Sequence, residues 1–178
     1  LPTTFPKRIE DNPAYLNYPG ENGEVLYGEG IFVGYRYYDR KRIEPRFAFG
    51  HGLSYTSFSY GELRLDRDTM AMNGELAASV EVTNAGERAG SEVVQLYLSD
   101  LECSLARPDQ ELKAFEKVAL APGETKTVRF TLTPSALSFY DPAQEGWVAE
   151  PGQFEVRIGA SSRDIRTHAR FELEASSS

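Results

Sequence analysis

The chain has 178 residues, of which 40% are hydrophobic, and its formal net charge is −8. This length suffices for one domain with its own hydrophobic core and a smaller additional segment. Because the acidic residues are spread along the chain, the charge argues against binding to nucleic acid or to an anionic membrane surface. The single cysteine, Cys103, excludes an internal disulfide and a zinc cluster. No apolar run reaches the roughly 20 residues needed to span a bilayer.

Residues 1–57 are rich in aromatic side chains but show no sustained helical or strand periodicity. They hold eleven of the 21 aromatic residues of the chain, together with many glycines and prolines. Disordered linkers are poor in aromatic residues, and so short and irregular a segment can hardly build its own core. We therefore expect it to lie in extended form against a surface that this chain does not contain, or contains only in part. The chain begins with Leu1, which indicates a processed start or a fragment.

The stretch GEGIFVGYRYYD, residues 28–39, is the densest aromatic part of this segment. Aromatic faces stack on sugar rings, and a neighbouring arginine and aspartate could hydrogen-bond sugar hydroxyls. The candidate substrate-binding residues are Tyr35, Arg36, Tyr37 and Asp39. The alternative, which we favour, is that the tyrosines pack at a domain interface, with each hydroxyl finding a partner.

Acidic residues in the same segment could in principle form a catalytic pair. A retaining glycosidase needs two carboxylates about 5 Å apart. The candidates are Glu24, Glu29, Asp39 and Glu44. Nothing in their spacing marks a pair, and acidic residues on loops are usually solvated, so we predict no catalytic residue here.

The stretch FAFGHGLSYTSF, residues 47–58, ends the segment with a histidine between two glycines. A catalytic or metal-binding role for His51 would need an orienting carboxylate, a nucleophile or further ligands. The other histidine, His168, is expected to point outward from the last strand. We favour a turn in which Gly50 and Gly52 supply unusual backbone angles and His51 hydrogen-bonds locally at a domain entry.

From residue 58 onward, hydrophobic and polar side chains alternate, as a sheet with one buried face requires. Turn signals such as Asn73-Gly74 and Pro122-Gly123 separate the alternating runs. A slip of the alternation between Leu112 and Phe115 predicts a β-bulge. The predicted strands lie near 58–66, 75–84, 91–99, 110–120, 124–133, 152–160 and 167–174.

Three further local features complete the pattern. The stretch TPSALSFY predicts a short helical turn with Thr133 as its cap and Pro134 at the first helical position. The acidic neighbours of Cys103 should raise the pKa of its thiol and make it unreactive. Trp147 is expected to pack onto the body of strands.

Seven strands in about 115 residues fit a two-sheet sandwich. We predict an all-β fold of the fibronectin type III or immunoglobulin kind over residues 58–178, preceded by the irregular aromatic segment of residues 1–57. The lack of an antibody-type cysteine pair favours the fibronectin-like form. No metal ligand and no cofactor are predicted.

Several stretches together resemble the C-terminal end of family 3 glycoside hydrolases of the β-glucosidase type. LPTTFP resembles the close of that family's α/β sandwich domain, and GEGIFVGYRYYD with FAFGHGLSYTSFSY resembles its connector. VTNAGERAGSEVVQLYLSD, RPDQELKAFEKVALAPGE and GQFEVRIGASSRDIR resemble its fibronectin type III-like domain. The resemblance covers nearly the whole chain, and the ordered combination is specific.

This resemblance implies that the Gly-His-Gly stretch is where the chain enters the sandwich. It also implies that the nucleophilic Asp and the acid/base Glu of the family lie upstream of Leu1, so no catalytic residue is carried over. The implied partners are the N-terminal barrel and α/β domains of the same enzyme, joined covalently or as a cleaved chain. A β-glucoside would be bound through those domains and hydrolysed with retention. The competing interpretations are a stand-alone module that binds carbohydrate or protein, and a plain structural sandwich without a ligand.

Overall fold

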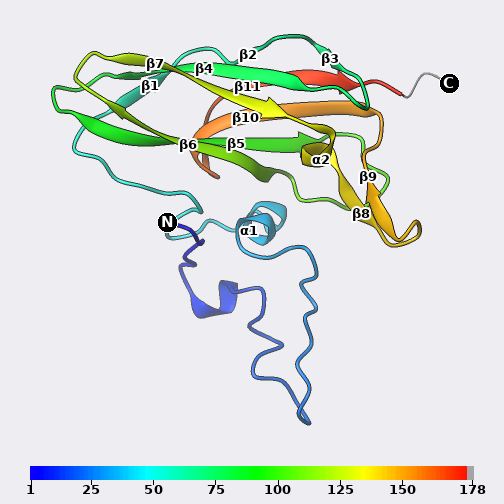
Figure 1. Ribbon diagram of the computed structural model, residues 1–178. Coiled ribbons are helices and arrows are strands. Elements are labelled where there is room, and N and C mark those ends of the chain that lie inside the picture. The colour runs from blue at the N-terminus through cyan, green and yellow to red at the C-terminus, as the bar shows by residue number, and fades with distance from the viewer. Residues whose placement is uncertain (176–178) are drawn as a thin grey trace.

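The alternating runs close into two packed β-sheets in the computed structural model, which describes residues 1–175 (Figure 1). The strands are β1 (Phe58–Tyr60), β2 (Arg64–Leu65), β3 (Thr69–Met70), β4 (Leu76–Asn84), β5 (Gly90–Asp100), β6 (Glu111–Leu120), β7 (Thr125–Leu132), β8 (Phe139–Asp141), β9 (Gly146–Val148), β10 (Gly152–Ser161) and β11 (Asp164–Leu173). The helices are η1 (Ile9–Asp11), α1 (Tyr35–Lys41) and α2 (Pro134–Leu137).

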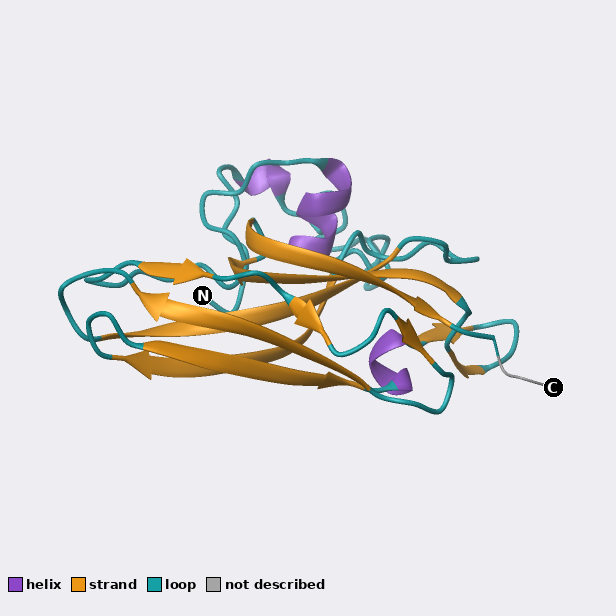
Figure 2. Cartoon of the chain, turned by 90° about the horizontal axis from the view of Figure 1, so that it is seen from above, coloured by secondary structure: helices purple, strands orange, loops and turns teal. Residues whose placement is uncertain are grey.

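The two sheets have different widths and are packed face to face (Figure 2). In the four-stranded sheet β4 pairs antiparallel with β1, β2 and β7. The five-stranded sheet has the order β3-β11-β10-β5-β6, and only the pairing of β3 with β11 is parallel. Strands β8 and β9 form a separate antiparallel hairpin. The predicted all-β sandwich is confirmed.

The core lies between the sheets and follows the predicted alternation. Along β4 the side chains of Leu76, Ala78, Val80 and Val82 are buried, and the residues between them are exposed or half-buried. These positions meet the inward faces of β5, β7, β10 and β11 in one hydrophobic cluster. Burial of this apolar surface is the main driving force for folding of the sandwich.

Six of the seven predicted strands are confirmed, as β4, β5, β6, β7, β10 and β11. The predicted strand 58–66 is wrong in its middle, where the chain leaves the sheet between β1 and β2. The backbone N–H of Leu63 donates to Thr167 Oγ1 instead of to a neighbouring strand, and the Leu63 side chain enters the core. The short strand β3 and the β8–β9 hairpin were not predicted.

The predicted bulge in β6 is confirmed. Leu96 pairs with Ala114 and Tyr97 pairs with Leu112, so Lys113 is the extra residue between them. The predicted helical turn is α2, with Pro134 in its first turn. Thr133 occupies the predicted cap position, and its hydroxyl hydrogen-bonds Ser135 Oγ rather than a helix N–H.

The leading segment leaves the sandwich and returns to it. An isolated pairing of Phe5 with Phe47 closes the excursion at its base. Residues 12–33, here called the arm, project from the body of strands in Figure 1 and end in a turn that pairs Glu21 with Glu24. The expectation of a wholly extended segment is wrong for Tyr35–Lys41, which form helix α1.

Candidate functional site

Helix α1 attaches the leading segment to the sandwich. It begins after Gly34, whose φ of +54° lies in the left-handed region that favours glycine. The Tyr35 ring stacks on Phe49 with centroids 4.9 Å apart, and its hydroxyl accepts a hydrogen bond from the Leu112 backbone N–H at 2.9 Å. Tyr38, one turn further along the helix, is 3% exposed. One face of this short helix is therefore committed to packing.

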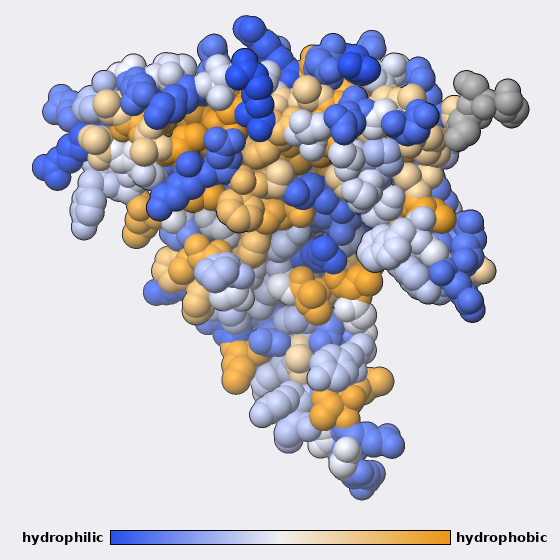
Figure 3. Space-filling model, viewed as in Figure 1, coloured by the Kyte–Doolittle hydropathy of each residue, from blue (hydrophilic) through white to orange (hydrophobic). Residues whose placement is uncertain are grey.

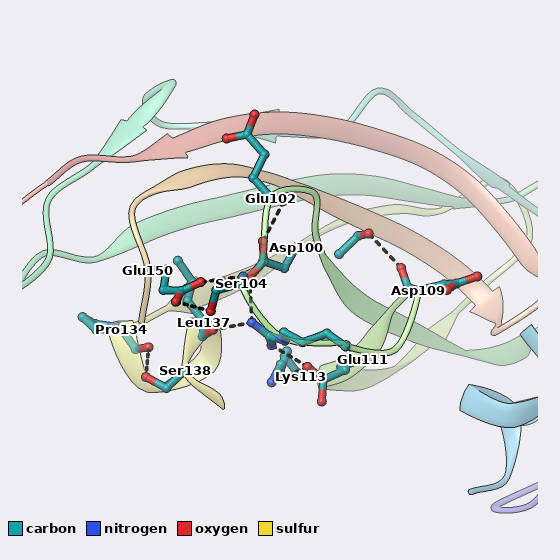
Figure 4. Close-up of polar contacts among 12 residues, drawn as sticks. Asp100, Glu102, Ser104, Asp109, Glu111, Lys113, Pro134, Leu137, Ser138 and Glu150 are labelled. Atoms are coloured by element: carbon teal, nitrogen blue, oxygen red, sulfur yellow. Dashed lines mark hydrogen bonds and ion pairs between the residues drawn. The ribbon is translucent and has the colours of Figure 1, made fainter. Parts of the chain in front are cut away.

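Glu111 joins α1 to the sandwich through two arginines. Its Oε1 lies 3.1 Å from Arg36 Nη2 of the helix, and its Oε2 lies 2.5 Å from Arg107 Nη2. The other guanidinium nitrogen of Arg107 lies 2.9 Å from Asp100 Oδ2. The side chains of Arg107 and Asp100 are only 7% and 4% exposed. These contacts form a buried ion network, part of which Figure 4 shows around Asp100 and Glu111. Glu111 links this network to the helix.

Arg107 also fixes the base of the β8–β9 hairpin. Its Nη1 donates to the Leu137 carbonyl oxygen at 2.9 Å, and its guanidinium lies 5.4 Å from the centroid of the Phe139 ring. At the other end of the hairpin, the Ser104 N–H donates to Glu150 Oε2 at 2.9 Å (Figure 4). The loop between β5 and β6 thus holds both ends of the hairpin.

The charges in this network shift the pKa values of its members. Burial raises the pKa of Glu111, but the hydrogen bond from Arg107 and the charges of Lys113 and Arg36 outweigh it, and the pKa lies below its ordinary value. Burial lowers the pKa of Lys113, and the attraction of Glu111 at 3.6 Å opposes this shift. The bulge in β6 places this lysine beside the carboxylate.

A second polar contact holds α1 from the side of the β10–β11 turn. Asp39 Oδ1 lies 2.7 Å from Arg163 Nε, and Gln110 Nε2 donates to Asp39 Oδ2 at 3.2 Å. Arg163 Nη2 also donates to the carbonyl oxygens of Tyr38 and Ile43. Burial raises the pKa of Asp39, and the charge of Arg163 offsets this only in part. The helix is thus held on two sides.

The structure places the four candidate substrate-binding residues together on α1. Tyr35, Arg36 and Asp39 are engaged with the sandwich by the contacts above. Tyr37 is half-buried, and its ring meets Tyr38 edge to face at 5.5 Å. A substrate-binding role for these four residues stays a prediction. The residues of the sandwich that contact α1 were not predicted, because in the sequence a charged residue near the start of a strand cannot be distinguished from one exposed to solvent. The slip in the alternation beside Leu112 was the local signal that this part of the strand is irregular.

The turn around His51 has the expected local character. The His51 N–H donates to the Ala48 carbonyl oxygen, and its ring lies 5.3 Å from Phe47. Gly50 has a φ of +80°, and a Cβ at this position would collide with the Gln95 side chain. Gly52 does not have a positive φ, so the expected unusual angle is wrong there. Among residues 1–175, no group of three His, Cys, Asp or Glu residues could hold a metal ion.

A groove of about 730 Å³ lies between this turn and strands β5 and β6. Gly50, Phe115, Glu92 and Arg166 are among the residues that line it. Burial raises the pKa of Glu92, while Arg166 is ion-paired with Asp164 at 2.7 Å. The walls of the groove are partly apolar and partly charged. Among the residues that line it, no nucleophilic side chain contacts a general base.

Three further predictions concern Cys103, Trp147 and His168. The pKa of Cys103 is raised as predicted, mainly by burial, with Asp100 and Glu150 adding to the shift. The prediction for Trp147 is wrong: it is 74% exposed, because it lies on the outer part of the β8–β9 hairpin. His168 is exposed on β11 as expected.

No helix within residues 1–175 has the length and apolar character that a membrane crossing requires.

The leading segment exposes most of its apolar side chains. Within residues 1–175, nineteen large hydrophobic residues are exposed, and fourteen of them lie within residues 1–57. On the arm they are Tyr15, Leu16, Tyr18, Val25, Leu26, Tyr27, Ile31 and Val33. Figure 3 shows hydrophobic residues along this projecting part of the molecule. A group of exposed apolar side chains on one projecting segment is typical of an interaction site.

Comparison with known proteins is consistent with this geometry. Residues 92–162 match the fibronectin type III-like domain family. The chain is 53% identical to the thermostable β-glucosidase B of Acetivibrio thermocellus over 93% of its own length and 22% of that protein. The crystal structure of a β-glucosidase from Kluyveromyces marxianus in complex with glucose has a TM-score of 0.88 and 43% identity, over 97% of this chain and 21% of that one. The crystal structure of a GH3 β-glucosidase from Bifidobacterium adolescentis has a TM-score of 0.90 and 38% identity, over 96% of this chain and 25% of that one.

The chain therefore spans only about a fifth to a quarter of the length of the relatives it matches. Nearly all of it is nevertheless matched, including the leading segment that lies outside the fibronectin type III-like match. The chain belongs with the family 3 glycoside hydrolases, as a portion of their length that contains a fibronectin type III-like domain.

Proposed function

We propose that this chain is the non-catalytic C-terminal portion of a family 3 β-glucosidase and that it supports the catalytic domains. The observation that carries the proposal is the contrast within the leading segment: α1 is held on the sandwich by ion pairs, while the arm exposes its apolar side chains. We take the division into a segment of residues 1–57 and a sandwich of residues 58–178 as part of this proposal.

The exposed rings of the arm would contribute to the free energy of docking. A buried aromatic side chain removes about 150–250 Å² from water, and apolar area is worth about 25 cal/mol per Å². Docking of even a few arm residues therefore contributes several kcal/mol before the costs of association are subtracted. The sandwich supplies a rigid base, and the arm supplies the hydrophobic surface that packs against the catalytic domains.

In the intact protein the proposed reaction is release of a terminal β-linked glucosyl residue with retention of configuration. Such a reaction uses two carboxylates, one as nucleophile and one as acid and base. We assign neither to this chain: Asp39 is held by Arg163 and Gln110, Glu24 and Glu44 are exposed to solvent, and Glu29 is half-buried on the arm. Glucose is the ligand of the Kluyveromyces marxianus relative.

The test compares the 178-residue chain with the intact protein. We expect the chain alone to leave an aryl β-glucoside unhydrolysed. Changing Tyr18, Leu26 and Tyr27 together to serine should lower the thermal stability and activity of the intact protein but leave the unfolding of the chain alone unchanged. The matched control changes Lys126, Arg129 and Thr131, exposed on β7, to serine. Turnover by the chain alone, or equal effects of the two triple variants on the intact protein, would contradict the proposal.

A stand-alone carbohydrate-binding module is the second candidate, and the exposed Trp147 is the observation that favours it. Binding of soluble β-linked oligosaccharides to the 178-residue chain, measured by quenching of its single tryptophan, would support it. We rank it below the first because the arm, rather than the sandwich, carries most of the exposed apolar residues.

A further inference from the structure

The β8–β9 hairpin carries two exposed aromatic rings on neighbouring strands. Tyr140 and Trp147 are paired across the hairpin, and they are 51% and 74% exposed. Their rings meet edge to face, with centroids 6.0 Å apart. Aromatic side chains are enriched in the buried centres of protein interfaces. Two neighbouring aromatic rings that are exposed in this chain therefore indicate a contact surface.

The hairpin is held in place. Arg107 binds the Leu137 carbonyl before β8, and Glu150 after β9 accepts two hydrogen bonds from Ser104. The same Arg107 is linked through Glu111 to Arg36 of helix α1. The hairpin and the helix that leads out of the arm are therefore tied to one buried network, so that both are presented from one rigid body.

The hairpin and the arm project from the same side of the sandwich in Figure 1. In the space-filling view they stand apart, with a recess between them (Figure 3). The relatives extend well beyond the matched portion, which covers 22% of the Acetivibrio thermocellus protein and 21% of the Kluyveromyces marxianus one. A body that docks on the arm from this side of the sandwich also faces the hairpin.

We propose that the β8–β9 hairpin is a second anchoring point for the remainder of the same polypeptide, with Trp147 and Tyr140 packed against it. This inference rests on the proposed function and adds a contact that the leading segment does not provide. The ring planes of Tyr140 and Trp147 are inclined by 76° to each other. They cannot both stack on one flat sugar chain, whereas a protein surface can receive a ring edge and a ring face together.

The experiment is hydroxyl-radical footprinting read out by mass spectrometry, applied without substitutions to the 178-residue chain and to the intact protein. We expect the oxidation rate of Trp147 to fall roughly fivefold or more in the intact protein, because the centre of an interface excludes solvent. The arm residues Tyr18 and Tyr27 should be protected in parallel. Pro122, exposed in the turn at the far end of β6, serves as the control whose rate should not change.

Each outcome decides between the two proposals. If the arm is protected and Trp147 is not, the hairpin is not an anchor and the proposed function stands. If neither is protected, both proposals fail. If cellotriose added to the 178-residue chain protects Trp147 while the remainder of the intact protein does not, the hairpin is a carbohydrate site and this inference is overturned.

Discussion

The sandwich and the leading segment both contain many hydrophobic residues, but the sandwich buries them and the leading segment exposes most of them. Among the residues that the structure describes, every buried hydrophobic side chain except Tyr38 lies in the sandwich, and most of the exposed ones lie in the leading segment. The difference follows from periodicity: alternation gives a strand one apolar face that a second sheet covers, whereas the arm has no regular face to pair. Apolar content alone therefore does not make a core.

The largest expected effect contrasts a buried leucine with an exposed one. Leu96 is fully buried in the core, and Leu16 on the arm is 90% exposed. Leu96→Ala should lower the free energy of unfolding of the 178-residue chain by about 2–5 kcal/mol, because it leaves a cavity. Leu16→Ala should change it by less than about 0.5 kcal/mol. Urea unfolding of both variants measures the difference, and similar losses would mean that the arm packs within this chain.

The next effect probes the network that joins the two regions. Glu111→Gln removes a carboxylate that contacts Arg107 and Arg36, and should cost on the order of 3 kcal/mol because the buried guanidinium of Arg107 loses a partner. The matched control is Asp39→Asn, which should cost less, because burial raises the pKa of the Asp39 carboxyl and so already disfavours its charged form. Equal losses in urea unfolding would show that Glu111 is not the principal link.

A smaller effect is expected at the entry to the sandwich. Gly50→Ala should destabilise the chain by about 1–3 kcal/mol, because a side chain is strained at φ +80° and would collide with Gln95. Gly52→Ala is the control, since no atom lies within 4 Å of a Cβ there. Thermal unfolding of both variants gives the comparison. If the two alanine variants melt together, the turn is not constrained as described.

The smallest effect is the pH dependence that Glu111 contributes. Its folded-state pKa lies below the ordinary value of 4.5, so its contribution to stability is present above that pH and is lost as the pH falls through the folded-state pKa. The stability difference between the wild-type chain and Glu111→Gln should therefore shrink as the pH is lowered from about 6 to about 3. Urea unfolding at several pH values measures it, and a constant difference would contradict the assigned shift.

Much of the sandwich could be predicted from the sequence, because long strands with one buried face leave a clear alternation. The slip beside Leu112 even located the bulge at Lys113. Helix α1 could not be found in this way. It has seven residues and is stabilised by contacts with Leu112, Glu111 and Arg163 rather than by a helical pattern of its own.

The anchoring contacts were hidden from sequence reasoning for a related reason. Glu111 and Arg163 are far from α1 in the sequence, and each looks like an ordinary surface charge. Trp147 was misjudged because a lone tryptophan near strands is usually buried. Its exposure follows from the separate β8–β9 hairpin, which the short stretch between Phe139 and Val148 did not reveal.

The pairing of Phe5 with Phe47 has a consequence for how this family can diversify. Since the excursion departs and returns at one point, residues can be added or removed within it without redirecting the path toward β1. Doubling the length of such a loop costs only about 0.6 kcal/mol in closure entropy. Evolution can thus change the length of the arm while the sandwich keeps its architecture.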